Sequence, residues 1–86
     1  MSQTRVSLSA DQIVEELRKW IVDHNPKAAH LDLDTDIVEG RLVDSLNFVN
    51  FLLLLEELRG AEVPEDQVDV DRFRSLGSIR AHFLVQ

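Results

Sequence analysis

Residues 42–60 read LVDSLNFVNFLLLLEELRG, and this stretch decides the fold. The apolar run within it predicts a helix from about Ser45 to Arg59, and Gly60 is the expected C′ residue. The serine at the head of this helix needs a separate explanation, because packing does not account for it. A hydroxyl at a helix N-terminus is exposed, and the free N–H groups and the helix dipole favour a phosphate nearby.

The connection before this helix, residues 27–44, is long and acidic. Leu31, Leu33 and Ile37 alternate with aspartates in it, a spacing that could indicate a strand. No other segment would pair with such a strand, and an isolated strand is unstable. We therefore predict a loop that these three apolar side chains pin to the helices, and a loop of this length usually has a functional reason. Gly40 near its end is expected to supply a positive φ angle.

The first helix is predicted from its capping pattern. Ser9 fits an N-cap, and Gln12 three residues later completes a capping box. Pro26 ends the helix near Asn25, because the residue before a proline avoids the helical region. The apolar residues that share one face of this helix are Ile13, Leu17, Trp20 and Ile21.

The chain after Gly60 predicts one short element and one last helix. The short element follows Pro64, and the last helix begins after the N-cap Ser75. Gly77 inside that helix is unfavourable by about 1 kcal/mol relative to alanine. The side chains expected to supply buried contacts are Val68, Val70 and Phe73 in the short element and Leu76, Ile79 and Phe83 in the last helix.

Together these elements predict an all-α fold. The expected architecture is a small four-helix bundle with three main helices, one short helix and a long loop after the first helix. Residues 1–86 are expected to form a single domain, in which residues 1–7 are a flexible N-terminal segment.

Composition narrows the function classes. The 86 residues include no cysteine, which excludes a disulfide framework, a thiolate metal site and a cysteine nucleophile. A net charge of −7 argues against nucleic acid, because phosphate backbones are bound by clusters of Lys and Arg. The longest apolar run, residues 51–55, is too short to span a bilayer, so no membrane is expected and a cytosolic location is the default. Nothing demands an oligomer, and we expect a monomer.

No catalytic residue and no metal site are predicted. Ser45 has no recognisable base beside it, and a nucleophilic serine needs a base within hydrogen-bond reach. The three histidines, His24, His30 and His82, are far apart in the sequence. The acidic loop lacks the glycine and the final glutamate of a calcium loop, so a solvated loop is the better interpretation.

The helix predicted at residues 45–59 is apolar on two faces, given about 100° per residue. The face expected to pack into the core comprises Phe48, Phe51, Leu52 and Leu55. The other face carries Leu46, Val49 and Leu53, with Asn50 and Glu57 beside them. A small bundle cannot cover a helix on all sides, so this second face is either a docking surface or core covered by the loop and the short element. Docking is favoured, because Ser45 lies at the end of the same stripe.

The triplet Asp44-Ser45-Leu46, between a long acidic loop and a helix ending in Glu56-Glu57, resembles the attachment site of the acyl carrier protein and peptidyl carrier protein family. The predicted order and spacing of the helices are similar to that family over nearly the whole chain. The resemblance implies a four-helix carrier protein and not an enzyme. It implies that Ser45 bears 4′-phosphopantetheine from coenzyme A, and that Asp44 and Leu46 belong to the recognition motif.

The resemblance also implies partners. These are a phosphopantetheinyl transferase, an adenylating ligase or acyltransferase that loads the thiol, and downstream synthase or modifying enzymes. The residues that would meet partner enzymes are Leu46, Val49, Asn50, Leu53, Glu56 and Glu57. The loop sequence is most similar to free-standing carriers of acyl or aminoacyl groups in specialised metabolism of the polyketide or nonribosomal peptide type. A fatty-acid-synthesis carrier and a D-alanyl carrier are alternatives.

Some residues depart from the family pattern. Asn47 and Asn50 stand where acidic residues are common, which predicts docking with less charge steering and more apolar contact. Arg59 projects toward the core face, where its stem could lie along the core while its head reaches water. Ser45 could also be a plain N-cap; if Asp44 is the cap instead, the hydroxyl of Ser45 stays free. An unmodified helical protein-interaction module is the alternative from another function class.

Overall fold

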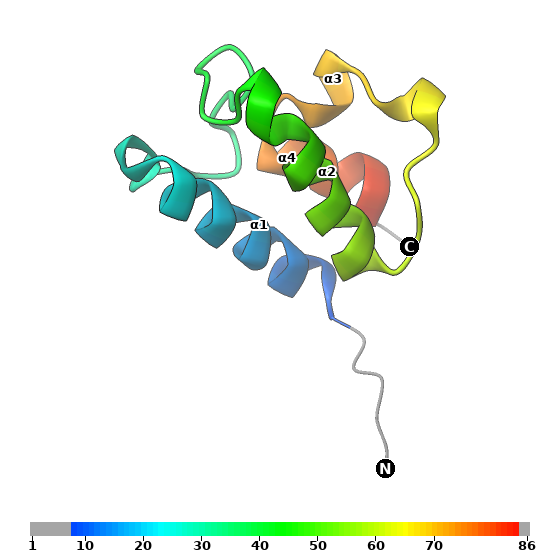
Figure 1. Ribbon diagram of the computed structural model, residues 1–86. Coiled ribbons are helices and arrows are strands. Elements are labelled where there is room, and N and C mark those ends of the chain that lie inside the picture. Colours follow the sequence, from blue (N-terminus) through cyan, green and yellow to red (C-terminus); the bar gives the residue numbers. More distant parts are fainter. Residues whose placement is uncertain (1–7, 85–86) are drawn as a thin grey trace.

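The computed structural model describes residues 8–84 and shows a small all-α fold (Figure 1). The expected flexible segment, residues 1–7, lies outside the described residues. The α-helices are α1 (Ala10–His24), α2 (Ser45–Arg59), α3 (Val70–Phe73) and α4 (Leu76–Ile79). Short 3-10 turns span Pro26–Ala28 and Glu65–Gln67, and a π-helical turn, Arg80–Leu84, continues α4.

The two long helices, α1 and α2, run in roughly opposite directions, and the last helix packs against α1 (Figure 1). Phe51 and Leu55 of α2 are fully buried, as are Leu17 and Ile21 of α1. The ring centroids of Trp20 in α1 and Phe51 in α2 lie 5.5 Å apart, so these rings join the two helices. The remaining fully buried large side chains come from the loop, α3 and α4, namely Ile37, Phe73, Leu76 and Ile79.

The predicted helix caps are confirmed. The Ser9 hydroxyl accepts a hydrogen bond from the N–H of Gln12 at 3.1 Å, and the Gln12 side chain accepts one from the N–H of Ser9 at 2.8 Å. Gly60 ends α2 with φ 73°, the left-handed conformation that glycine adopts most easily. Ser75 caps α4 by accepting a hydrogen bond from the N–H of Ser78 at 3.1 Å. These local signals position the helix ends.

The long loop is held by backbone hydrogen bonds as well as by apolar side chains. Leu31 and Ile37 are buried as predicted. The prediction for Leu33 was wrong, because its side chain is 47% exposed. Its carbonyl instead accepts a hydrogen bond from the N–H of Gly77 at 2.9 Å, and the N–H of Ile37 donates to the carbonyl of Arg74 at 2.7 Å. The first bond ties the loop to α4, and the second ties it to Arg74, which directly follows α3.

Val70 also differs from its prediction. It is 50% exposed, whereas Phe73 is buried and Val68 half-buried. Asp69 accepts a hydrogen bond from the N–H of Arg72 and so begins α3 at Val70. The single turn of α3 turns Phe73 into the core and leaves Val70 on the surface.

The positive φ angle near the end of the loop belongs to Arg41, with φ 57°, and not to Gly40. Gly40 is required for a different reason, since a Cβ atom there would lie 2.5 Å from the carbonyl oxygen of Asp36. The N–H of Gly40 donates a hydrogen bond to that same oxygen at 3.2 Å. The backbone therefore passes too closely for any side chain at residue 40, and the left-handed turn follows one residue later.

Gly77 is explained by the same kind of close approach, and its replacement by alanine should destabilise the protein. A Cβ atom at residue 77 would lie 2.9 Å from the carbonyl oxygen of Leu33. Overpacking of this kind costs about 1–3 kcal/mol, against a gain in helix propensity of about 1 kcal/mol. Chemical denaturation should therefore give a lower free energy of unfolding for Gly77→Ala. The control Asn50→Ala, at an exposed helical position, should change it little; a more stable Gly77→Ala protein would contradict the close approach.

Candidate functional site

The head of α2 leaves the hydroxyl of Ser45 free. Asp44 is the N-cap, and its Oδ1 accepts a hydrogen bond from the N–H of Asn47 at 2.9 Å. Ser45 is therefore the first helical residue, is exposed, and makes no side-chain hydrogen bond to the described residues. The interpretation of Ser45 as a plain N-cap is wrong, because Asp44 already fills that role. A hydroxyl at this place is open to modification without loss of the cap.

A cavity of about 570 Å³ lies beside Ser45, between the end of the loop, the first turn of α2 and the α3 segment. The rings of Phe48 and Phe73 meet edge to face, with centroids 5.3 Å apart, and both line it. The described residues that line it are Val38, Arg41, Val43, Asp44, Ser45, Phe48, Val68, Asp69, Val70 and Phe73. No residue pattern in the sequence points to this cavity, because its walls come from three separate segments.

These residues fit a phosphate-linked arm on Ser45. The first N–H groups of a helix have no partner within the helix, and at α2 the Asp44 side chain satisfies only that of Asn47. The remaining N–H groups and the helix dipole favour a phosphate on the adjoining hydroxyl. The cavity offers apolar walls along which a flexible chain could lie, and Arg41 supplies a positive charge at the same place.

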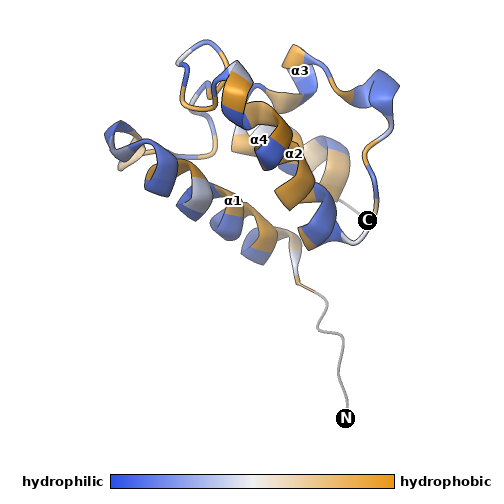
Figure 2. Ribbon diagram, viewed as in Figure 1, coloured by the Kyte–Doolittle hydropathy of each residue, from blue (hydrophilic) through white to orange (hydrophobic). Residues whose placement is uncertain are grey.

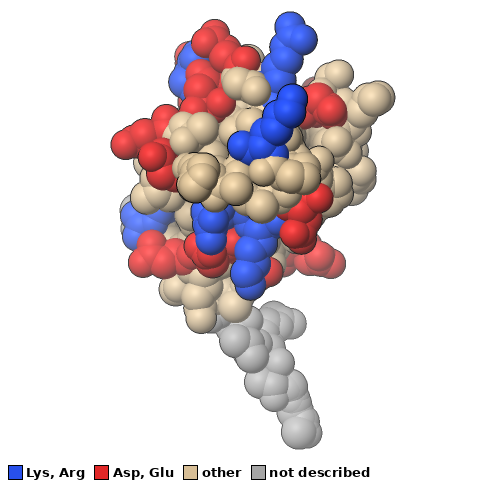
Figure 3. Space-filling view, turned by 90° about the vertical axis from the view of Figure 1, so that its left-hand side faces the viewer, with Lys and Arg blue, Asp and Glu red and all other residues tan. Residues whose placement is uncertain are grey.

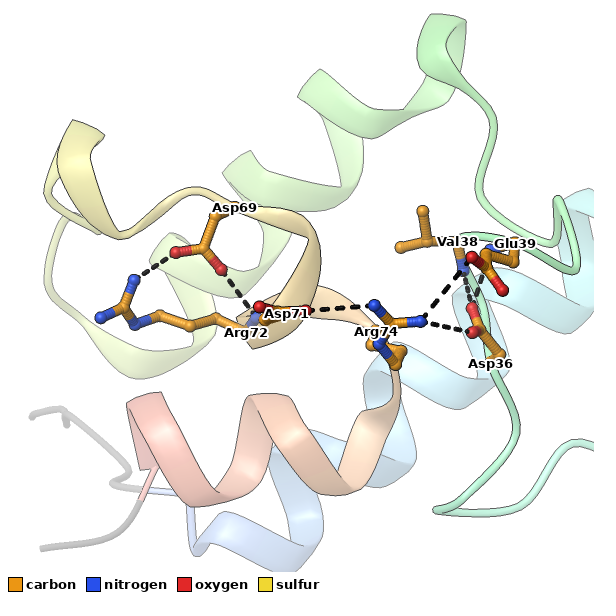
Figure 4. A network of polar contacts seen from close by, with 7 residues as sticks. All are labelled: Asp36, Val38, Glu39, Asp69, Asp71, Arg72 and Arg74. Carbon is orange, nitrogen blue, oxygen red and sulfur yellow. Dashed lines mark hydrogen bonds and ion pairs between the residues drawn. The ribbon is translucent and has the colours of Figure 1, made fainter.

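A network centred on Arg74 joins the two walls of this cavity (Figure 4). Its guanidinium lies 3.2 Å from Asp36 and 3.9 Å from Glu39, both in the loop, and 3.1 Å from Asp71 in α3. The backbone N–H of Glu39, then that of Val38 and the ion pair with Arg74, hold the pKa of Asp36 below its usual value, although desolvation opposes them. The loop wall and the α3 wall are therefore linked by charge.

The second apolar face of α2 is exposed, so its interpretation as core was wrong. Leu46, Val49 and Leu53 are 87%, 60% and 56% exposed. On the opposite face Phe51 and Leu55 are buried, as predicted, while Phe48 and Leu52 are half-buried. Figure 2 shows apolar colour along most of the visible ribbon of α2. We call Leu46, Val49 and Leu53 the α2 stripe; it begins next to Ser45.

The polar residues near the α2 stripe differ in their exposure and in their hydrogen bonds. Asn50 and Glu57 are exposed, whereas Glu56 is half-buried and accepts a hydrogen bond from the N–H of Val63 at 2.8 Å. Glu56 thus fastens the chain that follows α2. Arg59 donates to the carbonyls of Ala61 and Glu62 at 3.3 and 2.9 Å, and its guanidinium lies 5.6 Å from the centre of the Phe83 ring.

Other kinds of site find little support. Within residues 8–84, the structure gathers no group of three His, Asp or Glu side chains that could hold a metal ion. In the same part of the chain, every helix is too short or too polar to cross a membrane. Ring nitrogens of His24 and His82 lie 2.8 and 2.9 Å from carbonyls of their own helices. Figure 3 shows acidic and basic side chains interspersed on one face, with uncharged surface between them.

Three comparisons with known proteins gave no match: no family model, no curated protein and no solved structure is similar to this chain.

The contacts of the Asp36 carboxylate with the N–H groups of Val38 and Glu39 and with Arg74, here called the Asp36 anchor, predict that stability falls in acid. Its folded-state pKa lies below the unfolded value of about 3.9, so its contribution is complete above about pH 4 and is lost as the pH falls through the lower folded-state pKa. Urea denaturation between about pH 2 and pH 6 should show a weaker loss of stability on acidification for Asp36→Ala than for the parent. Asp34→Ala, which removes a loop carboxylate with no hydrogen bond to the described residues, should keep the parent slope. An unchanged slope in Asp36→Ala would contradict the anchor.

The two faces of α2 predict opposite outcomes for one substitution. Leu53→Glu should leave the free energy of unfolding within about 0.5 kcal/mol of the parent, because the side chain is exposed. Leu55→Glu, two residues later, buries a charge and should lower stability by more than about 3 kcal/mol or unfold the protein. Thermal and urea unfolding followed by circular dichroism would compare them. Equal losses would show that the α2 stripe is covered in solution.

Proposed function

We propose that this chain is a free-standing acyl or aminoacyl carrier protein in which Ser45 bears 4′-phosphopantetheine. The observation that carries the proposal is the division of roles at the head of α2. Asp44 caps the helix, and this leaves the Ser45 hydroxyl exposed, without a hydrogen bond to residues 8–84, and beside a cavity. The resemblance of Asp44-Ser45-Leu46 to the carrier family attachment site supplies the identity of the group.

The modification is a phosphoryl-type transfer from coenzyme A. The proton of the Ser45 hydroxyl passes to a basic group of the transferase, and Oγ forms a bond to the phosphorus that carries pantetheine. The bond from that phosphorus to the bridging oxygen breaks, and the nucleotide half of coenzyme A leaves with this oxygen. Magnesium and the basic groups of a phosphopantetheinyl transferase would be supplied by that enzyme. Once attached, the arm offers a thiol that holds an acyl or aminoacyl group as a thioester. The chain itself contains no cysteine, so a thiol must come from such an attachment.

The proposed partners meet the α2 stripe. A transferase, an adenylating ligase or acyltransferase, and downstream synthase or modifying enzymes must each reach Ser45, and the exposed Leu46 lies directly beside it. Val49 and Leu53 continue this apolar surface, and Asn50 and Glu57 border it. A small apolar stripe with few charges suits brief and weak encounters. Leu53→Glu should therefore slow loading of the arm while leaving the fold intact.

We place this carrier in specialised metabolism of the polyketide or nonribosomal peptide type, acting as a monomer in the cytosol. The loop sequence before Ser45 and the two asparagines of α2 support this setting over a fatty-acid-synthesis carrier. A D-alanyl carrier would use the same site with a different loading enzyme.

The α2 stripe by itself also supports a second candidate of another class. An unmodified interaction module would use Leu46, Val49 and Leu53 to bind another protein, and Ser45 would have no role. Modification of Ser45 separates the two candidates.

Intact-protein mass spectrometry tests the proposal. The folded protein is incubated with coenzyme A, magnesium and a broad-specificity phosphopantetheinyl transferase. The parent should gain the mass of one phosphopantetheine, whereas Ser45→Ala should gain none and should keep the parent melting temperature, since Asp44 provides the cap. Ser78→Ala is the matched control and should be modified like the parent. A folded parent that two different transferases leave unmodified would favour the interaction module.

A further inference from the structure

Arg41 is the single cationic residue among those that line the cavity beside Ser45. Two carboxylates, those of Asp44 and Asp69, line the same cavity. Asp69 is already paired with Arg72, and the Asp44 side chain accepts a hydrogen bond as the N-cap of α2. The exposed guanidinium of Arg41 is therefore available to an anion that enters this cavity.

Arg41 differs from the other arginines of the described residues. Each of the others has a polar partner, whereas the guanidinium of Arg41 has neither an ion pair nor a hydrogen bond within residues 8–84. The partners of the others are Glu15 for Arg18, the carbonyls of Ala61 and Glu62 for Arg59, Asp69 for Arg72, Asp36, Glu39 and Asp71 for Arg74, and Asp11 for Arg80. In a chain with 16 acidic and 9 basic residues, an unpaired arginine is the exception.

The backbone of Arg41 adds a second observation. Its φ of 57° lies in the left-handed region, where a side chain crowds the following carbonyl and glycine is preferred. Glycine would satisfy this turn with less strain, so the fold gains nothing local from arginine. Strained residues of this kind cluster at functional sites, where the role of the side chain outweighs the cost of the strained backbone.

The charge at the site indicates which anion Arg41 meets. A phosphodiester on Ser45 Oγ carries one negative charge and stands directly after the carboxylate of Asp44. Like charges this close repel each other, and a nearby cation offsets the repulsion. Arg41 lines the cavity with both residues, and guanidinium groups bind phosphate oxygens through two parallel hydrogen bonds.

We propose that Arg41 is a positioning residue that binds the phosphodiester on Ser45 and directs the arm along the adjacent cavity. This inference rests on the proposed function. It adds a residue on the carrier itself that orients the arm, with Val38 and Val70 as the apolar walls that the arm follows.

Nuclear magnetic resonance of the modified protein tests the proposal. In the parent, the side-chain Nε–H of Arg41 should shift on modification, and the methyl groups of the arm should show cross-relaxation with the methyl groups of Val38 and Val70. Arg41→Gln should lower these intensities about two- to fivefold, the change that an exposed charge pair makes, and Arg41→Lys should restore part of them. Raising the salt to about 1 M should weaken them in the parent, because the screening length falls to about 3 Å.

Two further variants separate positioning from structure. Arg18→Gln removes the same charge from α1 and should leave the arm signals unchanged. Arg41→Gly should raise the melting temperature, because it relieves the left-handed strain, and should still lose the arm signals. A variant that is more stable but no longer holds the arm would show that Arg41 positions the arm and does not stabilise the fold.

The possible failures are distinguishable by mass. A parent that gains no phosphopantetheine overturns both the proposed function and this assignment. A parent that gains the arm but shows no shift of Arg41 and no contact with Val38 or Val70 overturns the assignment alone. Equal arm signals in the parent and Arg41→Gln would also overturn it.

Discussion

The position of Ser45 depends on backbone hydrogen bonds that fasten the long loop to the C-terminal part of the chain. The N–H of Ile37 donates to the carbonyl of Arg74 at 2.7 Å, and the N–H of Gly77 donates to that of Leu33 at 2.9 Å. The carbonyl of Ile37 then accepts from the N–H groups of Leu42 and Val43, each at 3.1 Å. Because Val43 directly precedes Asp44, the N-cap of α2, these bonds fix the position of the cap. The burial of Ile37 adds an apolar anchor at the centre of these bonds.

The same anchoring creates the cavity. The loop supplies one wall and α3 the other, and Arg74 lies between them with partners on both sides. The pair with Asp36 is partly buried, whereas Glu39 and Asp71 are exposed, so the pairs with these two residues contribute little to global stability. Their effect is local: they relate the two walls to each other and to the first turn of α2. The two walls of the cavity are thus linked by charge pairs that lie outside the buried core.

Local signals in the sequence were sufficient for the helix ends; they divided α2 into two apolar faces but left open whether the second face is covered. Ser9, Ser75 and Gly60 act through neighbours a few residues away, so their roles follow from spacing alone. Leu33 and Val70 were predicted wrongly, because their burial depends on which distant segment covers them. An apolar side chain in a loop or a one-turn helix has no helical periodicity that fixes its direction. The residues that line the cavity could not be predicted for the same reason, since its walls meet only in the folded chain.

Glycines show this limit most sharply. In the sequence, Gly40 and Gly77 cannot be distinguished from a glycine that supplies a left-handed turn. In the structure, each is required because a carbonyl oxygen lies where a Cβ atom would stand. The left-handed turn falls instead on Arg41, where sequence rules would place glycine or asparagine. A residue that breaks a local rule without a local benefit points to a role beyond the fold. At the head of α2 the exceptions coincide within one short segment of the chain. Ser45 and the strained Arg41 make no side-chain hydrogen bond or ion pair within residues 8–84, and the exposed Leu46 begins an apolar stripe. Their coincidence, more than any one of them, supports the proposal that the functional site lies at this end of the molecule.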